Sequence, residues 1–390
     1  MLQPKLRFAI FKDTEWLYKK IGNILTIKHG KDYKNISRGN IPVLGTGGEI
    51  TKISKFLCDW PCVLIGRKGT IDHPQFMDKP FWAVDTLFFS KPEECNDPKF
   101  QYYLFQTINW KKYNEASGVP SLSASTIENI EVAIPSLKEQ QKIAFFFSTL
   151  DVKISINERK LETLEQLKKS LMQKIFSQEL RFKDENGEDY PEWTLTNFFD
   201  LIDSITDFRG RTPKKLGLEW SPTPTEHLAL SALNVKNWGI DYTVEAHYGD
   251  KVLYNKWMSG NELYKGQVLL TTEAPAGIVM QVPDNRKYIL SQRLLALNVN
   301  KYKASENFLA HLLRSNSIQQ NLKKLSTGGT ALGISQKSLK DLWLYHPASL
   351  EEQQKIASFF STLDEKNSLT RRKLETLNQL KKGFMQQMFV

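Results

Sequence analysis

The chain has few cysteines. Cys58, Cys62 and Cys95 are the only three among 390 residues. Their odd number, and their apolar and aromatic neighbours, favour free buried thiols in a reducing compartment over a disulfide framework. A zinc site would have to combine these three thiols with a histidine such as His73, and this alternative is the less favoured one.

Motifs of common catalytic and cofactor sites are also missing. The sequence contains no His-Glu-x-x-His, Cys-x-x-Cys, Walker or Gly-x-Ser-x-Gly motif, and no Gly-x-Gly-x-x-Gly opens a helix after a strand. Asp97-Pro98-Lys99-Phe100 resembles the Asp-Pro-Pro-Tyr tetrad of adenine methyltransferases only superficially, because Lys99 replaces the second proline and no glycine-rich cofactor loop precedes it. These absences predict a binding protein rather than an enzyme.

Long apolar runs are absent as well. No stretch approaches the roughly 18 to 20 apolar residues of a membrane span. The first residues, MLQPKLRFAIFKD, alternate basic and apolar side chains and contain no signal-peptide core. We therefore expect a soluble protein that is not exported by such a signal and has no membrane partner.

The composition is that of a folded protein with a basic surplus. Hydrophobic residues make up 41% and charged residues 25%, which excludes a disordered chain, and the length suggests two or three domains. Lysine and arginine number 53 against 43 acidic residues, so the formal net charge is +10. This surplus makes nucleic acid the first partner to consider.

An internal repeat organises the chain. EQQKIAFFFSTLD (residues 139–151) and EQQKIASFFSTLD (352–364) agree at twelve of thirteen positions at an offset of 213. At the same offset, RKLETLEQLKK (159–169) and RKLETLNQLKK (372–382) agree at ten of eleven positions. A weaker echo precedes each copy, at 117–135 and 327–347. The chain is thus a tandem duplication of one unit.

Each unit has the same order of parts. Leu6-Arg7-Phe8 followed by Trp16 recurs as Leu180-Arg181-Phe182 followed by Trp193. A body of little shared sequence follows, at roughly 17–134 and 194–346, and the helical module closes the unit. The repeated modules must perform the same task twice, whereas the divergent bodies act on different targets. If the arrangement is circular, the two ends of the chain lie close together.

The modules have helical periodicity. Apolar residues recur every three to five positions in the first copy, at Ile156, Leu161, Leu164, Leu167, Leu171 and Ile175, and in the second at Leu369, Leu374, Leu377, Leu380, Phe384 and Met388. Such a stripe needs a partner helix, and the other copy is the simplest one. The alternative is that each stripe packs on its own body. The preceding EQQKIAxFFSTLD segment predicts a shorter, separate helix, because Ser148, Thr149 and Asp151 interrupt the pattern.

The bodies predict strands joined by polar loops. Residues 61–71 read as a strand broken by Gly66-Arg67-Lys68-Gly69, residues 83–90 as a second strand, and residues 41–50 as a glycine-rich loop. In the second body, 266–282 reads as a hairpin around 273–277, and 288–299 as a strand that carries Gln292 and Arg293. The loop at 66–69 is either a solvated hairpin tip or a contact to phosphate or guanine. Gln292 and Arg293 are either base-reading side chains or a structural hydrogen-bonding pair.

Over its whole length, the chain resembles the specificity (S) subunit of type I restriction-modification systems. The resemblance lies in two dissimilar bodies separated by duplicated modules, EQQKIAxFFSTLD and RKLETLxQLKK. The phrases IGRKGTI, PFWAVDTLFF, GRTPKK, LSALNVKN, TTEAPAG and ILSQR resemble target recognition domains of that family. The resemblance implies an α+β fold with target recognition domains at 1–135 and 180–347. Helical conserved regions at 136–179 and 348–390 would pair as an antiparallel intramolecular coiled coil, in a pseudo-twofold tandem repeat.

The resemblance also implies a function. Each recognition domain would read one half of a bipartite, asymmetric target on double-stranded DNA, and the helices would set the half-site spacing and dock two modification (methyltransferase) subunits. Restriction (motor and nuclease) subunits would join them in the bacterial or archaeal cytoplasm. S-adenosylmethionine, ATP and magnesium would belong to these partners. This chain would hold no cofactor or metal and would have no catalytic residue.

Loop position and side-chain chemistry select candidate site residues. For DNA contact we select Arg67, Lys68, Thr70, Arg209, Arg211, Thr272, Glu273, Gln292 and Arg293. For the coiled coil and partner binding we select Leu161, Leu164, Leu171, Leu374, Leu377 and Phe384. Two other readings stay open, namely a self-sufficient methyltransferase or nuclease, and a coiled-coil adaptor with an incidental basic surface.

Overall fold

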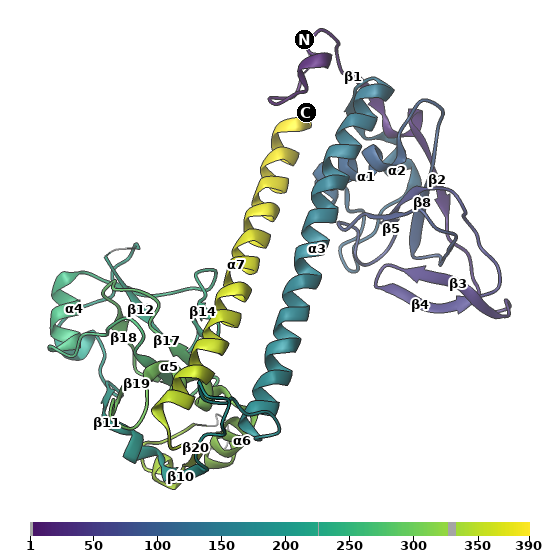
Figure 1. The fold of residues 1–390 in the computed structure, drawn as a ribbon. Coiled ribbons are helices and arrows are strands. Elements are labelled where there is room, and N and C mark those ends of the chain that lie inside the picture. Colours follow the sequence, from purple (N-terminus) through teal and green to yellow (C-terminus); the bar gives the residue numbers. More distant parts are fainter. Residues whose placement is uncertain (1–2, 225, 327–332) are drawn as a thin grey trace. The chain divides into compact units, whose positions relative to one another are not determined.

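The computed structural model describes residues 3–224, 226–326 and 333–390. The chain divides into two compact units (Figure 1). Unit 1 comprises Met1–Glu158 and Arg372–Val390, and unit 2 comprises Arg159–Arg371. Each unit therefore holds one body, one half of the long helix α3 (Leu137–Phe176) and one half of the long helix α7 (Leu350–Met388). The sequence predicted four parts, with the helices separate from the bodies. The two compact units instead combine each body with parts of both helices, so the four-part division stays a prediction.

The body of unit 1 contains two small sheets beside a strand pair. One sheet has the order β2-β8-β5-β6, the second has the order β4-β3-β7, and β1 pairs with β9. Helix α1 (Pro98–Thr107) begins at Asp97, whose side chain accepts a hydrogen bond from the backbone of Phe100, and α2 (Ala124–Asn129) is capped by Ser123 in the same way. The strands are β1 (Leu17–Lys20), β2 (Leu25–His29), β3 (Arg38–Gly45), β4 (Gly48–Ile53), β5 (Cys62–Gly66), β6 (Gln75–Met77), β7 (Trp82–Ala83), β8 (Leu87–Pro92) and β9 (Glu131–Ile134).

The body of unit 2 repeats this plan with additions. Its sheets have the orders β11-β19-β16-β17 and β15-β12-β18, and β10 pairs with β20. The helices are α4 (Lys251–Met258), α5 (Glu306–Arg314) and α6 (Asn316–Leu325). The strands are β10 (Trp193–Asn197), β11 (Ile202–Asp207), β12 (His227–Leu230), β13 (Val235–Lys236), β14 (Gly239–Ile240), β15 (Tyr248–Gly249), β16 (Val268–Thr271), β17 (Val279–Gln281), β18 (Ile289–Leu290), β19 (Leu294–Val299) and β20 (Trp343–Pro347).

The two bodies share a topology although they share little sequence. In the four-stranded sheets, all neighbouring strands run antiparallel in both units. In the three-stranded sheets, one pair is parallel in each unit, β3 with β7 and β12 with β18. The echo that ends each body also has a common form, a short helical turn followed by β9 or β20; its residues 327–332 lie outside the described residues.

Each helical module is one continuous helix, so the prediction of a separate shorter helix was wrong. Helix α3 has 40 residues and α7 has 39. Thr149 stays within the helix because its hydroxyl donates to the carbonyl oxygen of Phe145, four residues earlier, at 2.8 Å. Asp151 does not cap a new helix, because its carboxylate binds Tyr103 and Lys381.

The two helices pack together as an antiparallel pair, which confirms the predicted arrangement. In unit 1 the ring centroids of Phe146 and Phe384 lie 5.2 Å apart, while Asp151 pairs with Lys381. In unit 2 Glu165 pairs with Arg371 and Phe176 stacks on Phe360 at 6.0 Å. The ends of both helices also enter the cores of the bodies, so the alternative interpretation, that each stripe packs on its own body, is correct for these ends.

The apolar seam follows a strict heptad pattern, which differs in part from the predicted stripe. The buried or half-buried positions alternate by three and four residues, as at Ile154, Asn157, Leu161, Leu164, Lys168, Leu171 and Ile175 of α3. Ile156, Leu167, Leu369 and Leu380 were predicted to belong to the stripe but lie exposed. The seam positions beside Ile156 and Leu167 are polar, Asn157 and Lys168, so the neighbouring apolar residues were chosen in their place. Ile156 and Leu369 lie on the outer side of their helices, and Leu167 and Leu380 lie at the edge of the seam.

The two ends of the described chain lie close together, as the circular arrangement predicted. Both belong to unit 1, where the backbone N–H of Leu6 donates to the carbonyl oxygen of Gln387 at 2.9 Å (Figure 1). Phe8 contacts Phe146, and Phe389 stacks on Phe100 at 5.6 Å. Residues 1 and 2 of the predicted initial segment lie outside the described residues.

Three local predictions need correction. Residues 41–50 form most of the β3–β4 hairpin and not a loop, because Val43 and Leu44 are buried and pair with β4. Residues 288–299 form two short strands, β18 and β19, separated by a turn at 291–293. Cys58 and Cys62 are buried thiols, with sulfur atoms 3.8 Å apart, but Cys95 is exposed.

Within the described residues, no helix is both long enough and apolar enough to cross a membrane. The same residues contain no group of histidine, cysteine and carboxylate side chains that could hold a metal ion.

Candidate nucleic-acid interface

The predicted basic loop of unit 1 lies where three distant segments meet. Arg67 and Lys68 follow β5 directly, and the backbone N–H of Arg67 donates to the carbonyl oxygen of Thr86 at 2.8 Å. On the other side, the N–H of Leu122 donates to the carbonyl oxygen of Arg67 at 2.9 Å, and Lys68 forms a bridge with Ser121. We call these three segments, 67–70, 85–86 and 120–122, the unit 1 edge.

Glycine makes the tight loop of this edge possible. A Cβ on Gly66 would lie 2.1 Å from the carbonyl oxygen of Thr70, so any larger residue would push the loop open. Gly69 has a φ of +89°, a conformation that other residues rarely adopt. The loop thereby exposes Lys68 and Thr70 and leaves Arg67 half-buried, with its Nη1 donating to the carbonyl oxygen of Asp85 at 3.2 Å.

Unit 2 contains the same backbone arrangement. The N–H of Thr272 donates to the carbonyl oxygen of Arg293 at 2.9 Å, and the N–H of Ile334 donates to the carbonyl oxygen of Thr272 at 2.8 Å. Glu273 forms the bridge to Gly333 that corresponds to the bridge between Lys68 and Ser121. We call the segments 272–273, 292–293 and 333–334 the unit 2 edge.

The side chains of the two edges differ. Arg67 and Lys68 in unit 1 occupy the positions of Thr272 and Glu273 in unit 2. Arg293 is exposed beside Glu273, with its Nε 3.6 Å from the carboxylate. One backbone arrangement therefore presents two different sets of hydrogen-bonding groups, as two different base sequences would require.

Arg209, Arg211 and Gln292 are partly committed to contacts within unit 2. The guanidinium of Arg209 holds the carboxylate of Asp207, with its Nε at 2.7 Å. The Arg211 guanidinium lies over the ring of Phe208 at 4.3 Å and donates to the carbonyl oxygen of Trp257, while the Gln292 amide donates to the carbonyl oxygen of Arg211. Of the two roles that the sequence left open for Gln292, the structure shows the structural hydrogen bond. Arg209 keeps part of its guanidinium group exposed.

Thr272 lies inside the body. Its side chain is 1% exposed, and its hydroxyl has no hydrogen-bond partner among the described residues. Thr272 could therefore contact DNA, as predicted, only if the residues that cover its side chain moved away.

The selected coiled-coil residues lie in the helix seam. Leu161, Leu164, Leu374 and Leu377 are half-buried on α3 and α7. Leu171 packs against the core of unit 2 and Phe384 packs against the core of unit 1. Their role in binding a partner protein stays a prediction.

Equivalent ion pairs join the helices in the two units. Asp151 pairs with Lys381 at 2.7 Å in unit 1, and Asp364 pairs with Lys168 in unit 2. Burial lowers the pKa of Lys168, although the Asp364 carboxylate acts in the opposite direction. Arg314 also contacts Asp364, at 3.4 Å, so this carboxylate neutralises two buried cations.

A buried carboxylate anchors the initial segment of each unit, and sequence reasoning missed it. Glu139 is 1% exposed as a side chain and accepts bonds from Arg7, at 2.7 Å to each oxygen, and from the indole of Trp16 at 3.3 Å. Glu352 accepts bonds from Arg181 and from Trp193, at 3.3 and 3.1 Å. The repeated order of arginine, tryptophan and glutamate could have revealed these anchors.

Comparison with known proteins gives the family. The family described as "Type I restriction modification DNA specificity domain" matches residues 13–166 and 248–379, more than half of the chain. The chain belongs to this family. It is a DNA-specificity subunit of a type I restriction-modification system and is not itself catalytic. The alternatives of a self-sufficient enzyme and of an adaptor with an incidental basic surface are thereby wrong.

Curated specificity subunits are similar over long stretches. The MjaVIII specificity subunit of Methanocaldococcus jannaschii is 24% identical over 314 residues, which cover 76% of this chain and 71% of that subunit. The EcoDI specificity subunit of Escherichia coli is 25% identical over 243 residues, covering 60% of this chain and 53% of that subunit. The fold matches the crystal structure of the S subunit from M. genitalium with a TM-score of 0.72 at 14% identity, over 100% of this chain and 99% of that one.

Proposed function

We propose that each body of this specificity subunit reads one half of a bipartite, asymmetric DNA target through its edge. The observation that carries the proposal is the shared backbone of the two edges with different side chains, Arg67 and Lys68 against Thr272 and Glu273. Arginine and lysine suit guanine acceptors or phosphates, and glutamate suits the amino group of cytosine. The side chains proposed to contact DNA are the exposed Lys68, Thr70, Arg209 and Arg293, together with the half-buried Arg67 and Glu273.

The long helices would set the spacing between the half-sites and dock two modification subunits. Support for a fixed spacing comes from the continuity of α3 and α7 and from their heptad seam. Support for two identical partners comes from exposed residues that are the same in both copies, although packing within the chain does not require them to be. Gln141, Lys153 and Lys160 are exposed and identical in the other copy, as Gln354, Lys366 and Lys373. Surfaces that bind the same partner must stay alike.

In the assembled complex, the modification subunits would methylate adenine within the target, and the restriction subunits would cleave unmodified DNA after ATP hydrolysis. S-adenosylmethionine, ATP and magnesium would be held by these partners. The basic surplus of this chain would add affinity for DNA through counterion release, while contacts to base edges would choose the sequence.

The test is single-molecule sequencing of DNA from a methylation-free host that expresses this chain with its modification subunit. We expect adenine methylation on one motif with two short defined halves around a fixed undefined gap. Replacing Arg293 and Glu273 by alanine should relax only one half of that motif, because both residues lie on the unit 2 edge. Replacing the exposed Tyr302, which lies on a different loop of unit 2, is the matched control. A complex that assembles but leaves no motif would overturn the proposal.

A further inference from the structure

The outward faces of α3 and α7 differ at three positions in a heptad line. Lys138, Phe145 and Val152 of α3 stand where α7 has Glu351, Ser358 and Glu365, and all six residues are exposed. Residues seven apart lie on the same face of a helix. These three differences therefore lie on one continuous stripe, which we call the outer stripe.

The outer stripe of unit 1 is apolar with a basic end. Phe145 is 70% exposed, Val152 is 59% exposed and Ile156, on the same face, is 57% exposed. Single exposed apolar residues are ordinary, but three at helical spacing form the kind of face that another helix covers. The seam already occupies the opposite side of α3, so this face is not used by α7.

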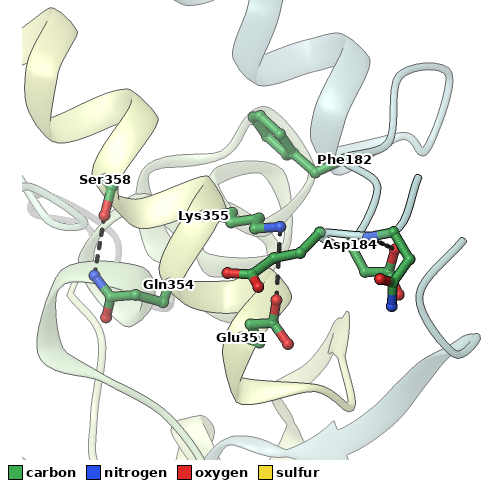
Figure 2. A pocket seen from close by; sticks show the side chains of 8 residues that line it. Phe182, Asp184, Glu351, Gln354, Lys355 and Ser358 are labelled. Carbon is green, nitrogen blue, oxygen red and sulfur yellow. Dashed lines mark hydrogen bonds and ion pairs between the residues drawn. The ribbon is translucent and has the colours of Figure 1, made fainter. Parts of the chain in front are cut away.

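The outer stripe of unit 2 is acidic and opens into a pocket. The pocket has a volume of about 700 Å³ and lies between the first turns of α7 and the loop after Arg181 (Figure 2). Asp184 and Glu185 line it from the loop, and Glu351 and Ser358 from the helix. This loop has eleven residues between Arg181 and Trp193, against eight between Arg7 and Trp16 in unit 1.

The contacts within the pocket hold its acidic wall in place. The Tyr190 hydroxyl donates to Glu351 at 2.7 Å, and the Lys355 ammonium lies 3.6 Å from the same carboxylate. Asp184 accepts backbone bonds from Asn186 and Glu188, both at 2.8 Å. Ser358 accepts a bond from Gln354 at 3.0 Å, whereas the equivalent position in unit 1 carries the large side chain of Phe145.

Three helix residues that flank the stripe are the same in both copies. Lys142, Thr149 and Lys153 flank the stripe of α3, and Lys355, Thr362 and Lys366 flank that of α7. The same kind of partner can therefore approach both faces. Both faces present an exposed apolar residue, Ile156 or its equivalent Leu369, but they differ in presenting Phe145 and Val152 in unit 1 against Ser358 and Glu365 in unit 2. Covering Phe145 and Val152 is favourable, whereas covering Glu365 removes a charge from water.

We infer that the two modification subunits bind this chain with unequal affinity. The first binds the outer stripe of unit 1, in a contact that is largely apolar and weakly dependent on salt. The second binds the outer stripe of unit 2 more weakly, in a contact that depends on salt because carboxylates of the stripe and pocket face basic groups of the partner. This inference rests on the proposed function, because it takes the modification subunit as the occupant of both faces.

The experiment titrates the full-length chain with its modification subunit and follows one-to-one and one-to-two complexes by native mass spectrometry. We expect two dissociation constants that differ by at least about tenfold, or about 1.4 kcal/mol. The double variant F145S/V152E, which gives unit 1 the residues of unit 2, should weaken the tighter step by at least about tenfold. The reverse variant S358F/E365V should strengthen the weaker step. Replacing Tyr302, 93% exposed on a loop of unit 2, by serine is the control for loss of an exposed aromatic side chain.

Hydrogen exchange of the one-to-one complex identifies the occupied face. Protection should appear first in peptides around 138–156 and not around 351–369. Equal affinities, protection of unit 2 first, or affinities unchanged in both double variants would each overturn the inference and leave the proposed function intact. If the folded wild-type chain binds no modification subunit at all, the proposed function itself fails.

Discussion

The backbone N–H of Leu6 donates to the carbonyl oxygen of Gln387 at 2.9 Å, and unit 2 repeats this bond between Leu180 and Lys174 at 3.1 Å. Gln387 and Lys174 are equivalent positions of the two long helices, and Leu6 and Leu180 begin the same Leu-Arg-Phe sequence. In unit 2 the Leu-Arg-Phe segment follows its helix directly along the chain. In unit 1 the equivalent segment lies near residue 1 and binds the end of α7. The Leu-Arg-Phe segment therefore packs on the end of a long helix in the same way in both units.

A circular permutant should therefore fold. Opening the chain between Ser177 and Gln178 and joining the original ends by a glycine-serine linker of about six residues should preserve DNA binding and thermal stability. The new ends would be held by the bond between Leu180 and Lys174, as the present ends are by Leu6 and Gln387. Opening inside the buried strand β16, between Leu269 and Leu270, is the control that should not fold. An insoluble permutant at residue 178 would contradict the prediction.

Replacing Glu139 by alanine should lower the free energy of unfolding of unit 1 by about 3–5 kcal/mol, because it leaves the buried Arg7 charge without its carboxylate, with only the bonds to Thr14 remaining. Replacing Glu352 should cost less, because Arg181 is more exposed and lies 3.3 Å from that carboxylate instead of 2.7 Å. Urea unfolding, followed by the tryptophan fluorescence of the whole chain, measures both.

The matched control for the buried anchors is Glu162→Ala, an exposed glutamate on α3 that should change stability by less than about 0.5 kcal/mol. Equal losses for Glu139→Ala and Glu162→Ala would mean that the anchor does not hold the initial segment in place.

His311 should make unit 2 lose stability in acid. Burial, and then the nearby charges of Arg314 and Lys168, hold its pKa well below the usual value near 6.5. The unfolded chain binds a proton on this residue below about pH 6.5 while the folded chain does not, so stability falls as the pH drops below that value. His346 acts in the same direction, because burial lowers its pKa too.

Urea unfolding at several pH values measures this effect. Between pH 6.5 and pH 5 we expect His311→Gln to reduce the slope of stability against pH, by up to about 1.4 kcal/mol per pH unit for the single group. An unchanged slope in His311→Gln would show that the ring is not kept neutral in the folded chain.

Replacing both Arg67 and Lys68 by alanine should weaken binding of the assembled complex to its target and reduce the salt dependence. If both side chains contact phosphates, the slope of log K against log salt falls by about 1.8, or about 0.9 for each contact. If Arg67 reads a base edge, the slope falls by less and one half of the motif loses specificity at about 1–3 kcal/mol. Lys91→Ala on β8 is the control. Unchanged affinity would remove this loop from the interface.

Some predictions from the sequence succeeded because they rest on local patterns. The duplication is visible as identity, and the helical period of Leu161, Leu164 and Leu171 follows from the chain alone. The stripe was assigned with an error at Ile156 and Leu167 because the neighbouring seam positions hold the polar residues Asn157 and Lys168, which a search for apolar residues passes over. Ser148 and Thr149 were misread as a break because a mid-helix hydroxyl can bond the preceding turn instead of a cap.

The candidate site was predicted only in part. Arg67, Lys68, Glu273 and Arg293 were chosen by chemistry, and the structure places all four on the two edges, with Lys68 and Glu273 at equivalent positions. Thr272 was chosen on the same grounds, yet it is buried, since its neighbours in space come from residues far away in sequence.

The amino-acid sequence by itself determined the tandem plan, the two long helices and the family, because repeats, helical period and residue identity are read along the chain. Only the tertiary structure decided that Arg67 lies between Thr86 and Leu122, that the two bodies share a topology without shared sequence, and that Phe145 faces outward while Phe147 is buried. These relations depend on strand order and on contacts between distant segments. No local sequence pattern encodes these relations. Many different sequences can form the same buried sheet, and each of them places different side chains at the edge of that sheet.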